Sequence, residues 1–210
     1  KGGGHRQGRG HAFTAGTMRG ERQLKRDYDA IHYIQRQLSG FEDKKMVFAM
    51  TKAFNKMCAA EEPDGCLSTT VELFIALKYL GYKPRICYGL VVPPSGYEFY
   101  HAWLELDGKI VDIAIYGNAK FSPFSTFDVR FPIVMGSYEA NEQGMEYRPF
   151  TFDEDWRDAL ISKVQGMPVV EYCDKSPKRI LWKFACDLLD MSPLKANVDA
   201  LRDTVKDDVI

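Results

Sequence analysis

Apolar side chains recur at helical spacing through the first 80 residues of the chain. The spacing predicts an amphipathic helix over 22–38, a second over 43–58, and a third that opens on a cysteine over 66–80. Gly81 stands just past the third helix, where a C-terminal glycine is typical. The expected buried stripes are Leu24, Tyr28, Ile31 and Leu38 in the first helix and Val47, Met50, Phe54 and Met57 in the second.

The pattern then changes to short segments typical of β-strands. Asp107-Gly108 separates two of them, and this dipeptide is a strong signal for a hairpin with a two-residue turn. The mixture of Pro, Ser and aromatic residues over 117–144 gives no clear assignment. The expected strands cover 85–92, 97–106, 109–116 and 131–135.

Helical spacing returns towards the C-terminus. The expected helices there cover 153–165, 176–189 and 192–207. Helices thus precede and follow a meander of strands, and this order predicts an α+β fold. We expect one domain over 18–210 with Met18 as a candidate start. The basic, glycine-rich stretch over 1–17 is expected to be a disordered tail or a cloning remnant, and a nucleic-acid-binding arm is the lesser alternative.

Composition and charge limit the class of partner. The 210 residues are 45% hydrophobic and 27% charged, which is normal for one soluble globular domain. The formal net charge of −1 gives no global electrostatic reason to expect a nucleic acid or a membrane as partner. No apolar run approaches the ~18–20 residues that span a bilayer, and no secretory signal is visible. We therefore expect a cytoplasmic protein, and its oligomeric state stays open.

The cysteines are odd in number, dispersed along the chain and without a CxxC pair. This pattern argues against a disulfide framework or a zinc site and is typical of a reducing compartment. We expect no cofactor and no metal, and most of the cysteines should be small buried apolar residues. The five are Cys58, Cys66, Cys87, Cys173 and Cys186.

The Asp107-Gly108 turn determines which residues of the hairpin lie together. With this dipeptide at the centre of the turn, Trp103 faces Asp112, and His101 shares the same, more polar face of the hairpin. His101 and Asp112 become diagonal neighbours at roughly 7–8 Å between backbones, so the carboxylate can bond one imidazole nitrogen. The alternative is an edge histidine and a solvated aspartate, and a three-residue turn would separate the pair.

Cys66 is expected at the first position of the third helix. The N–H groups of a first helical turn have no internal partner and the dipole is positive there, which favours a thiolate and offers a donor to an oxyanion. With His101 in reach, Cys66, His101 and Asp112 have the parts of a nucleophilic triad. Trp103 and Ser68 are the candidate substrate-binding residues. Cys66 as a buried helix-start cysteine is the alternative, and no second oxyanion donor is singled out.

These blocks carry a family resemblance. Gly65-Cys66-Leu67 opening an apolar helix, His101-Ala102-Trp103-Leu104-Glu105 before Asp107-Gly108, and Val111-Asp112 resemble the transglutaminase-like superfamily. The nearest part of it is the small bacterial branch that includes the lasso-peptide leader peptidases. The resemblance implies a papain-like α+β core, with the nucleophile helix packed on an antiparallel sheet. The helices expected before Cys66 and after Phe152 are additions that the resemblance does not cover. It also implies Cys66 as nucleophile, His101 as base and Asp112 as the residue that orients it.

The function that we expect is cysteine-dependent acyl transfer on an amide or thioester, first of all peptide or amide hydrolysis. The substrate would be a peptide or another acyl donor. One alternative is an amide-forming acyltransferase of a natural-product pathway, and another is a non-catalytic binding module that keeps the fold. Arylamine N-acetyltransferases share the Cys-His-Asp order, but the Arg-Gly-Gly that usually precedes their cysteine is absent. A metal site at Cys66, His101 and Asp112 lacks further ligands.

Overall fold

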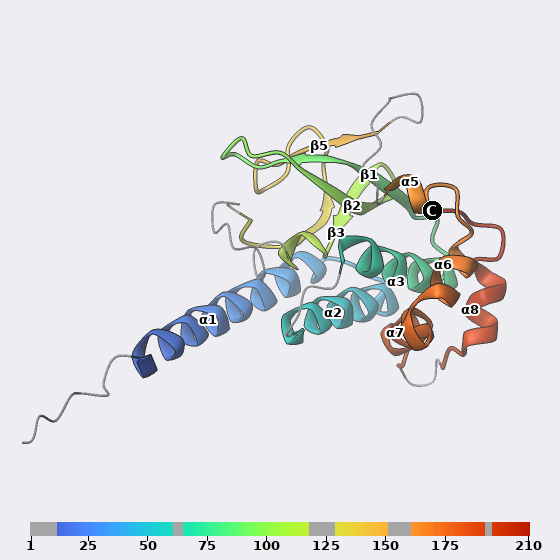
Figure 1. Ribbon diagram of the computed structural model, residues 1–210, viewed down its shortest axis with the longest axis horizontal. Coiled ribbons are helices and arrows are strands. Elements are labelled where there is room, and N and C mark those ends of the chain that lie inside the picture. Colours follow the sequence, from blue (N-terminus) through green and yellow to red (C-terminus); the bar gives the residue numbers. More distant parts are fainter. Residues whose placement is uncertain (1–11, 61–64, 118–128, 151–160, 192–194) are drawn as a thin grey trace, which may run out of the picture.

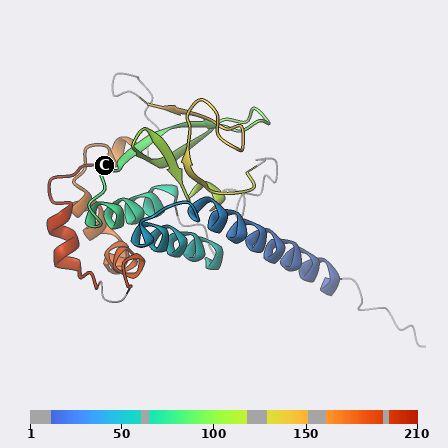
Figure 2. The ribbon, with the colours of Figure 1, turned by 180° about the vertical axis from the view of Figure 1, so that it is seen from behind.

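A computed structural model describes residues 12–60, 65–117, 129–150, 161–191 and 195–210. Helices lie on one side of the molecule and a curled antiparallel sheet on the other, and the first turns of the N-terminal helix project away from the rest (Figures 1 and 2). The helices are α1 (Ala12–Leu38), α2 (Lys44–Ala59), α3 (Cys66–Tyr79), α5 (Ile161–Val164), α6 (Val169–Lys175), α7 (Ile180–Leu188) and α8 (Val198–Thr204). The strands are β1 (Arg85–Val92), β2 (Phe99–Leu106), β3 (Lys109–Asp112), β4 (Ile133–Gly136) and β5 (Glu146–Pro149). The α+β fold with added helices is as expected.

The sheet is built around the predicted hairpin. Its strand order is β4-β3-β2-β1-β5, and every neighbouring pair is antiparallel. Leu106 pairs with Lys109. Asp107 and Gly108 have φ of 51° and 71°, the left-handed conformation that both central residues of a type I′ turn require. The predicted turn and its register are confirmed.

The main core lies between one face of the sheet and the helices. It includes Ala102, Leu104 and Val111 from the hairpin, together with nearly all of α3. Gly81, at φ 91°, ends α3 as expected, and the N–H of Tyr82 closes the motif on the carbonyl of Leu77 at 3.0 Å. Because α3 is buried on most sides, its place against the sheet is strongly determined.

The opposite face of the hairpin is buried as well. Trp103 and Ile110 lie there in a second apolar cluster, covered by side chains such as Ile133, Met145 and Tyr147. We expected this face to be the polar one. Side chains of β4, β5 and neighbouring segments close over it, so His101 and Asp112 are only 2% and 1% exposed.

The N-terminal helix differs from the expectation in length and orientation. It begins at Ala12, so residues 12–17 are helical and the expected domain boundary at residue 18 falls inside α1. Leu24 and Tyr28 are 70% and 62% exposed, while Ala30, Ile34 and Leu38 form the buried stripe. Ala30, Ile34 and Leu38 pack in the main core, and the Asp27 side chain accepts a hydrogen bond from Tyr116.

Two strands end differently from the expectation, and one strand was not foreseen. β2 begins at Phe99, and β3 ends at Asp112 because the Asp112 side chain accepts the N–H of Ile115 at 2.9 Å and turns the chain. β5 is the unforeseen strand, and it approaches β1 so closely at Gly89 that a β-carbon there would collide with the Arg148 carbonyl.

The other elements follow the prediction with moved boundaries. The expected strand at 131–135 is β4, moved towards the C-terminus. The expected helix over 176–189 is divided into a 3₁₀ turn at Pro177–Arg179 and α7, and α8 covers only the middle of 192–207. α6, which precedes the 3₁₀ turn, was not expected. The expected helix over 153–165 overlaps α5, and its residues 153–160 lie outside the described part. No helix in the described part of the chain is long and apolar enough to cross a membrane.

Candidate active site

The thiol of Cys66 lies at the first residue of α3. The preceding residue, Gly65, occupies the N-cap with φ −58° and ψ 141° and has no side chain to accept the first-turn N–H groups. In an α-helix those groups have no partner within the helix. Cys66 is partly buried, and its backbone N–H belongs to this uncapped turn.

The start of α3 is held against β2 through the backbone of Ala102. The Thr70 hydroxyl donates to the Ala102 carbonyl at 3.0 Å, and the Ala102 N–H donates to the sulfur of Cys66. Cys66 and Thr70 are four residues apart and therefore share one face of the helix. Two bonds from one helical turn to one strand residue thus place the thiol next to His101.

The N–H and C=O of Ala102 are available to α3 because β3 ends before it reaches Ala102. A two-residue turn makes Leu106 and Lys109 a hydrogen-bonded pair, so Leu104 and Ala102 direct their N–H and C=O groups to the same side. Leu104 meets Val111 there, but β3 ends at Asp112 before it reaches Ala102. The first turn of α3 takes the place of the missing strand residue. The helix packs in the core formed by Ala102 and Leu104 on the apolar face of the hairpin, and not against the face that carries His101.

His101 and Asp112 form the buried pair that the turn predicted. Nε2 of His101 lies 2.9 Å from Oδ2 and 3.1 Å from Oδ1 of Asp112. The carboxylate also accepts the Tyr147 hydroxyl at 2.7 Å and the Ile115 N–H at 2.9 Å. With these partners the carboxylate is held in one position, and it fixes the imidazole with Nε2 turned towards it.

Nδ1, the other ring nitrogen of His101, is buried and has no hydrogen-bond partner in the described part of the chain. The thiol of Cys66 is close enough for thiol and ring to shift each other's pKa. Contacts between a nucleophile and its base are often loose before a substrate binds. Nδ1 is therefore placed to give or take a proton at Cys66.

The charges favour an ion pair between Cys66 and His101. Burial alone would lower the pKa of His101, but the Asp112 carboxylate and the thiol outweigh it and raise this pKa to about 10. Burial alone would raise the pKa of Cys66, but the His101 ring and the Ala102 N–H outweigh it and lower the pKa below its ordinary value. Both shifts are in the direction that favours the charged forms, thiolate and imidazolium.

The two predicted substrate-binding residues lie near the triad in different settings. Trp103 has no exposed surface, and its Nε1 donates to the Tyr138 hydroxyl at 3.0 Å. Its ring meets that of Tyr147 edge to face at 5.0 Å, and Tyr147 is the residue whose hydroxyl donates to Asp112. The described conformation leaves Trp103 no surface for a substrate, and that contact stays a prediction. Ser68 is half-buried with its hydroxyl 3.4 Å from that of Tyr172.

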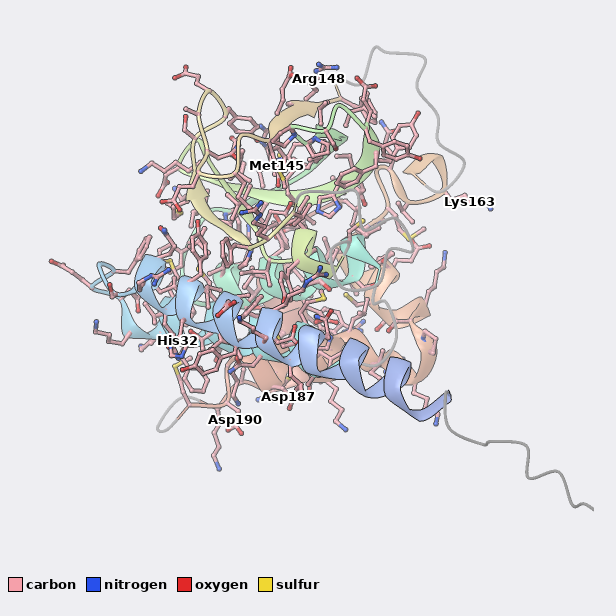
Figure 3. All side chains as sticks on the ribbon, turned by 90° about the vertical axis from the view of Figure 1, so that its left-hand side faces the viewer. His32, Met145, Arg148, Lys163, Asp187 and Asp190 are labelled. Atoms are coloured by element: carbon pink, nitrogen blue, oxygen red, sulfur yellow. The ribbon has the colours of Figure 1, made fainter. Side chains whose placement is uncertain are left out.

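Three other cysteines and His32, all in the described part of the chain, have surroundings that differ from those of Cys66 and His101. Burial raises the pKa of Cys87, Cys173 and Cys186, the opposite direction to Cys66. His32 lies on α1 with its ring against Tyr28 (Figure 3). The part of the chain that is described contains no group of three or more His, Cys, Asp or Glu residues that could hold a metal ion.

An open cavity of about 240 Å³ lies elsewhere, lined by Asp187, Asp190 and neighbouring residues at the end of α7. In Figure 3 those two residues lie on the helical side, away from Arg148 of β5 and from Met145, which directly precedes that strand. None of the triad residues lines this cavity.

Sequence reasoning missed three tyrosines around the triad. Tyr147 was missed because β5 has no clear pattern of its own. Tyr88 and Tyr172 both lie close enough to Cys66 for a thiolate there to raise their pKa. Tyr88 could have been found by pairing the two predicted strands 85–92 and 97–106, while Tyr172 on α6 depends on how distant helices pack.

One comparison with known proteins gave a match. A family model described as the transglutaminase-like superfamily matches residues 14–126, more than half of the chain, and that span contains Cys66, His101 and Asp112. No curated protein and no solved structure matches the chain.

Proposed function

This chain belongs to the transglutaminase-like superfamily, and from that premise we propose that it is an enzyme with Cys66 as nucleophile, His101 as acid and base, and Asp112 as orienting residue. The family in general carries out cysteine-dependent acyl transfer or hydrolysis. The observation that carries the proposal is the hydrogen-bonded pair of His101 and the buried Asp112 carboxylate, with the thiol of Cys66 close enough to the ring for each to shift the other's pKa. Such an arrangement supports nucleophilic catalysis.

The reaction begins with attack of the Cys66 thiolate on a carbonyl carbon. The S–C bond forms while the C=O π electrons move to the oxygen. When the tetrahedral intermediate collapses, the bond to the leaving group breaks and the proton of His101 Nδ1 goes to that group. The acyl group stays on the sulfur as a thioester, and water or an amine, deprotonated by His101, then takes it.

Peptide or amide hydrolysis is the subclass that we propose first. The Gly65-Cys66-Leu67 and His101-Ala102-Trp103 blocks support a place near the bacterial branch with the lasso-peptide leader peptidases. Transfer of the acyl group to an amine uses the same triad, so an amide-forming acyltransferase is the second candidate. All five cysteines are free, which supports a cytoplasmic location.

Alkylation of the thiol tests the activated nucleophile directly. We expect iodoacetamide at pH ~6 to label Cys66 at least ~10-fold faster than the other cysteines, because an ordinary thiol with a pKa near ~8.5 is almost fully protonated there. The labelled site is read by peptide mass spectrometry. Cys186→Ala is the matched control and should leave the fast phase intact, whereas Cys66→Ala should remove it.

Labelling of Cys66 at the rate of the other thiols would contradict the proposal and favour a binding module that keeps the fold.

A second experiment distinguishes hydrolysis from transfer of the acyl group. Cys66 is acylated with p-nitrophenyl acetate, and a primary amine is added. Release of acetate unaffected by the amine supports hydrolysis, and formation of the acetamide supports transfer.

A further inference from the structure

Unpaired buried polar groups are concentrated around Cys66. In the described part of the chain, three buried side-chain polar atoms have no hydrogen-bond partner: Oγ1 of Thr69, Oη of Tyr88 and Nδ1 of His101. Native proteins contain few such atoms, and each one calls for an explanation. Nδ1 of His101 faces the thiol, and Thr69 lies one helical turn after Cys66. Because Nδ1 serves the thiol, the hydroxyls of Tyr88 and Thr69 are the groups whose hydrogen-bonding capacity is left for a bound molecule.

Strand pairing places Tyr88 beside the same helical turn. Tyr88 in β1 lies directly opposite Ala102 in β2, and side chains of such a pair share one face of the sheet with β-carbons ~4.5–5.5 Å apart. Ala102 is the residue whose N–H and C=O hold Cys66 and Thr70. The ring of Tyr88 thus packs in the same core as Cys66 at the start of α3.

Tyr172 is the other hydroxyl near the thiol, and it differs from Tyr88 in one respect. Its hydroxyl is 3.4 Å from that of Ser68, so it already has a partner. The Tyr88 hydroxyl has none. Burial and the neighbouring Tyr172 and Cys66 raise the pKa of Tyr88, so its proton stays in place as a donor.

We propose that the Tyr88 hydroxyl donates a hydrogen bond to the oxyanion that forms when Cys66 attacks a carbonyl, with the backbone N–H of Cys66 as the second donor. This rests on the proposed function. As the S–C bond forms, negative charge collects on the former carbonyl oxygen, which can then accept from both donors. When the intermediate collapses and the leaving group departs with the proton of His101, the C=O bond returns and Tyr88 keeps its proton.

Two reagents distinguish stabilisation of the oxyanion by Tyr88 from activation of the Cys66 thiol. Iodoacetamide alkylates Cys66 by direct displacement without an oxyanion, while p-nitrophenyl acetate acylates it through a tetrahedral intermediate. We expect Tyr88→Phe to leave the alkylation rate within about twofold of wild type and to lower the acylation rate ~10²–10³-fold, the usual effect of losing one oxyanion donor. Tyr172→Phe, the matched control, should leave both rates within a few-fold of wild type.

Equal loss of both rates in Tyr88→Phe would show an effect on the thiol and overturn the proposal. An unchanged acylation rate, with Cys66→Ala inactive towards both reagents, would also overturn it and leave the proposed function standing. A wild-type protein that is neither labelled fast nor acylated would instead defeat the proposed function and this role with it.

Wild-type protein supplies a measurement that does not depend on a variant folding. Replacing the carbonyl oxygen of the ester by sulfur weakens its hydrogen bonds, so the protein should discriminate against the thionoester at least ~10-fold more than free cysteine does. Equal discrimination would overturn the proposal. Tyr88→Phe should keep or raise Tm, because it removes an unpaired buried hydroxyl.

Discussion

The first turns of α2 and α3 both have backbone N–H groups without a partner inside the helix, and the two helix starts treat these groups differently. At α2, the Asp43 side chain accepts the N–H groups of Lys45 and Met46 at 2.8 and 3.3 Å and the Tyr82 hydroxyl at 2.5 Å. At α3, Gly65 offers no side chain, and unpaired atoms of Tyr88 and His101 lie near the first turn. The first helix start is arranged for stability. The second has no side-chain cap in the described part of the chain, as at helix starts that bind an anion.

The largest expected effect comes from replacing Asp112, the carboxylate that holds the His101 ring. Asp112→Asn keeps the size of the side chain but removes the charge that holds the His101 imidazolium. We expect the rate of Cys66 acylation by p-nitrophenyl acetate to fall on the order of 10⁴-fold, as for the loss of an orienting aspartate in other triads. Near-wild-type circular dichroism is the folding control. A loss below tenfold would remove Asp112 from the proposed mechanism.

The pH dependence of alkylation probes the Cys66–His101 pair. The reactive thiolate is present above the pKa of Cys66 and is lost as pH falls through it, and this pKa lies below the ordinary value. In His101→Ala, burial acts without the opposing ring, so the midpoint should move to higher pH and the rate at pH ~6 should fall at least ~10-fold. The rate of iodoacetamide labelling across pH 5–10 measures this. Identical midpoints in the two proteins would refute the ion pair.

Removal of the α2 cap tests the stability side of the comparison. Asp43→Ala should lower the free energy of unfolding by about 1–2 kcal/mol, because two N–H groups and the Tyr82 hydroxyl lose their acceptor. Urea denaturation gives the value, and the acylation rate should stay at the wild-type level. If acylation were lost in a folded Asp43→Ala protein, the two helix starts would be coupled and the contrast between them would not hold.

The smallest expected effect comes from adding a cap to α3. Among the described residues, a β-carbon at Gly65 would meet only the Ser68 hydroxyl, at 3.9 Å, so Gly65→Ser fits there. Its hydroxyl should accept the N–H of Leu67 or Ser68 and raise the free energy of unfolding by a few tenths of a kcal/mol. Because the N–H of Cys66 stays open, acylation should change less than threefold. A large loss of acylation would mean that the oxyanion uses the later N–H groups.

Local signals were enough for the elements on which the site is built. Helical spacing located α2 and α3 to within a residue or two, because each buries a regular apolar stripe. The strand 85–92 was located with equal accuracy. The same reasoning failed for the face of α1, because Leu24 and Tyr28 are as apolar as the residues that are buried, and only packing distinguishes them.

Contacts between segments far apart in the chain could not be predicted from the sequence. Nothing in the Glu-Tyr-Arg-Pro stretch of β5 predicts a strand, since its place depends on an edge of β1 that exists only in the folded protein. Tyr147 reaches Asp112 from that strand. The burial of His101 also depends on these segments, and without it the ring would have an ordinary aqueous environment.

The sequence by itself determined the two halves of the candidate site. Asp107-Gly108 set the hairpin register that brings His101 to Asp112, and the glycine before Cys66 left a helix start uncapped, because turns and helix ends depend on dihedral angles a few residues apart. Only the tertiary structure decided that the halves meet. β3 ends one residue before it would pair with Ala102, so the first turn of α3 binds there, and that contact joins segments whose approach depends on the packing of the whole core.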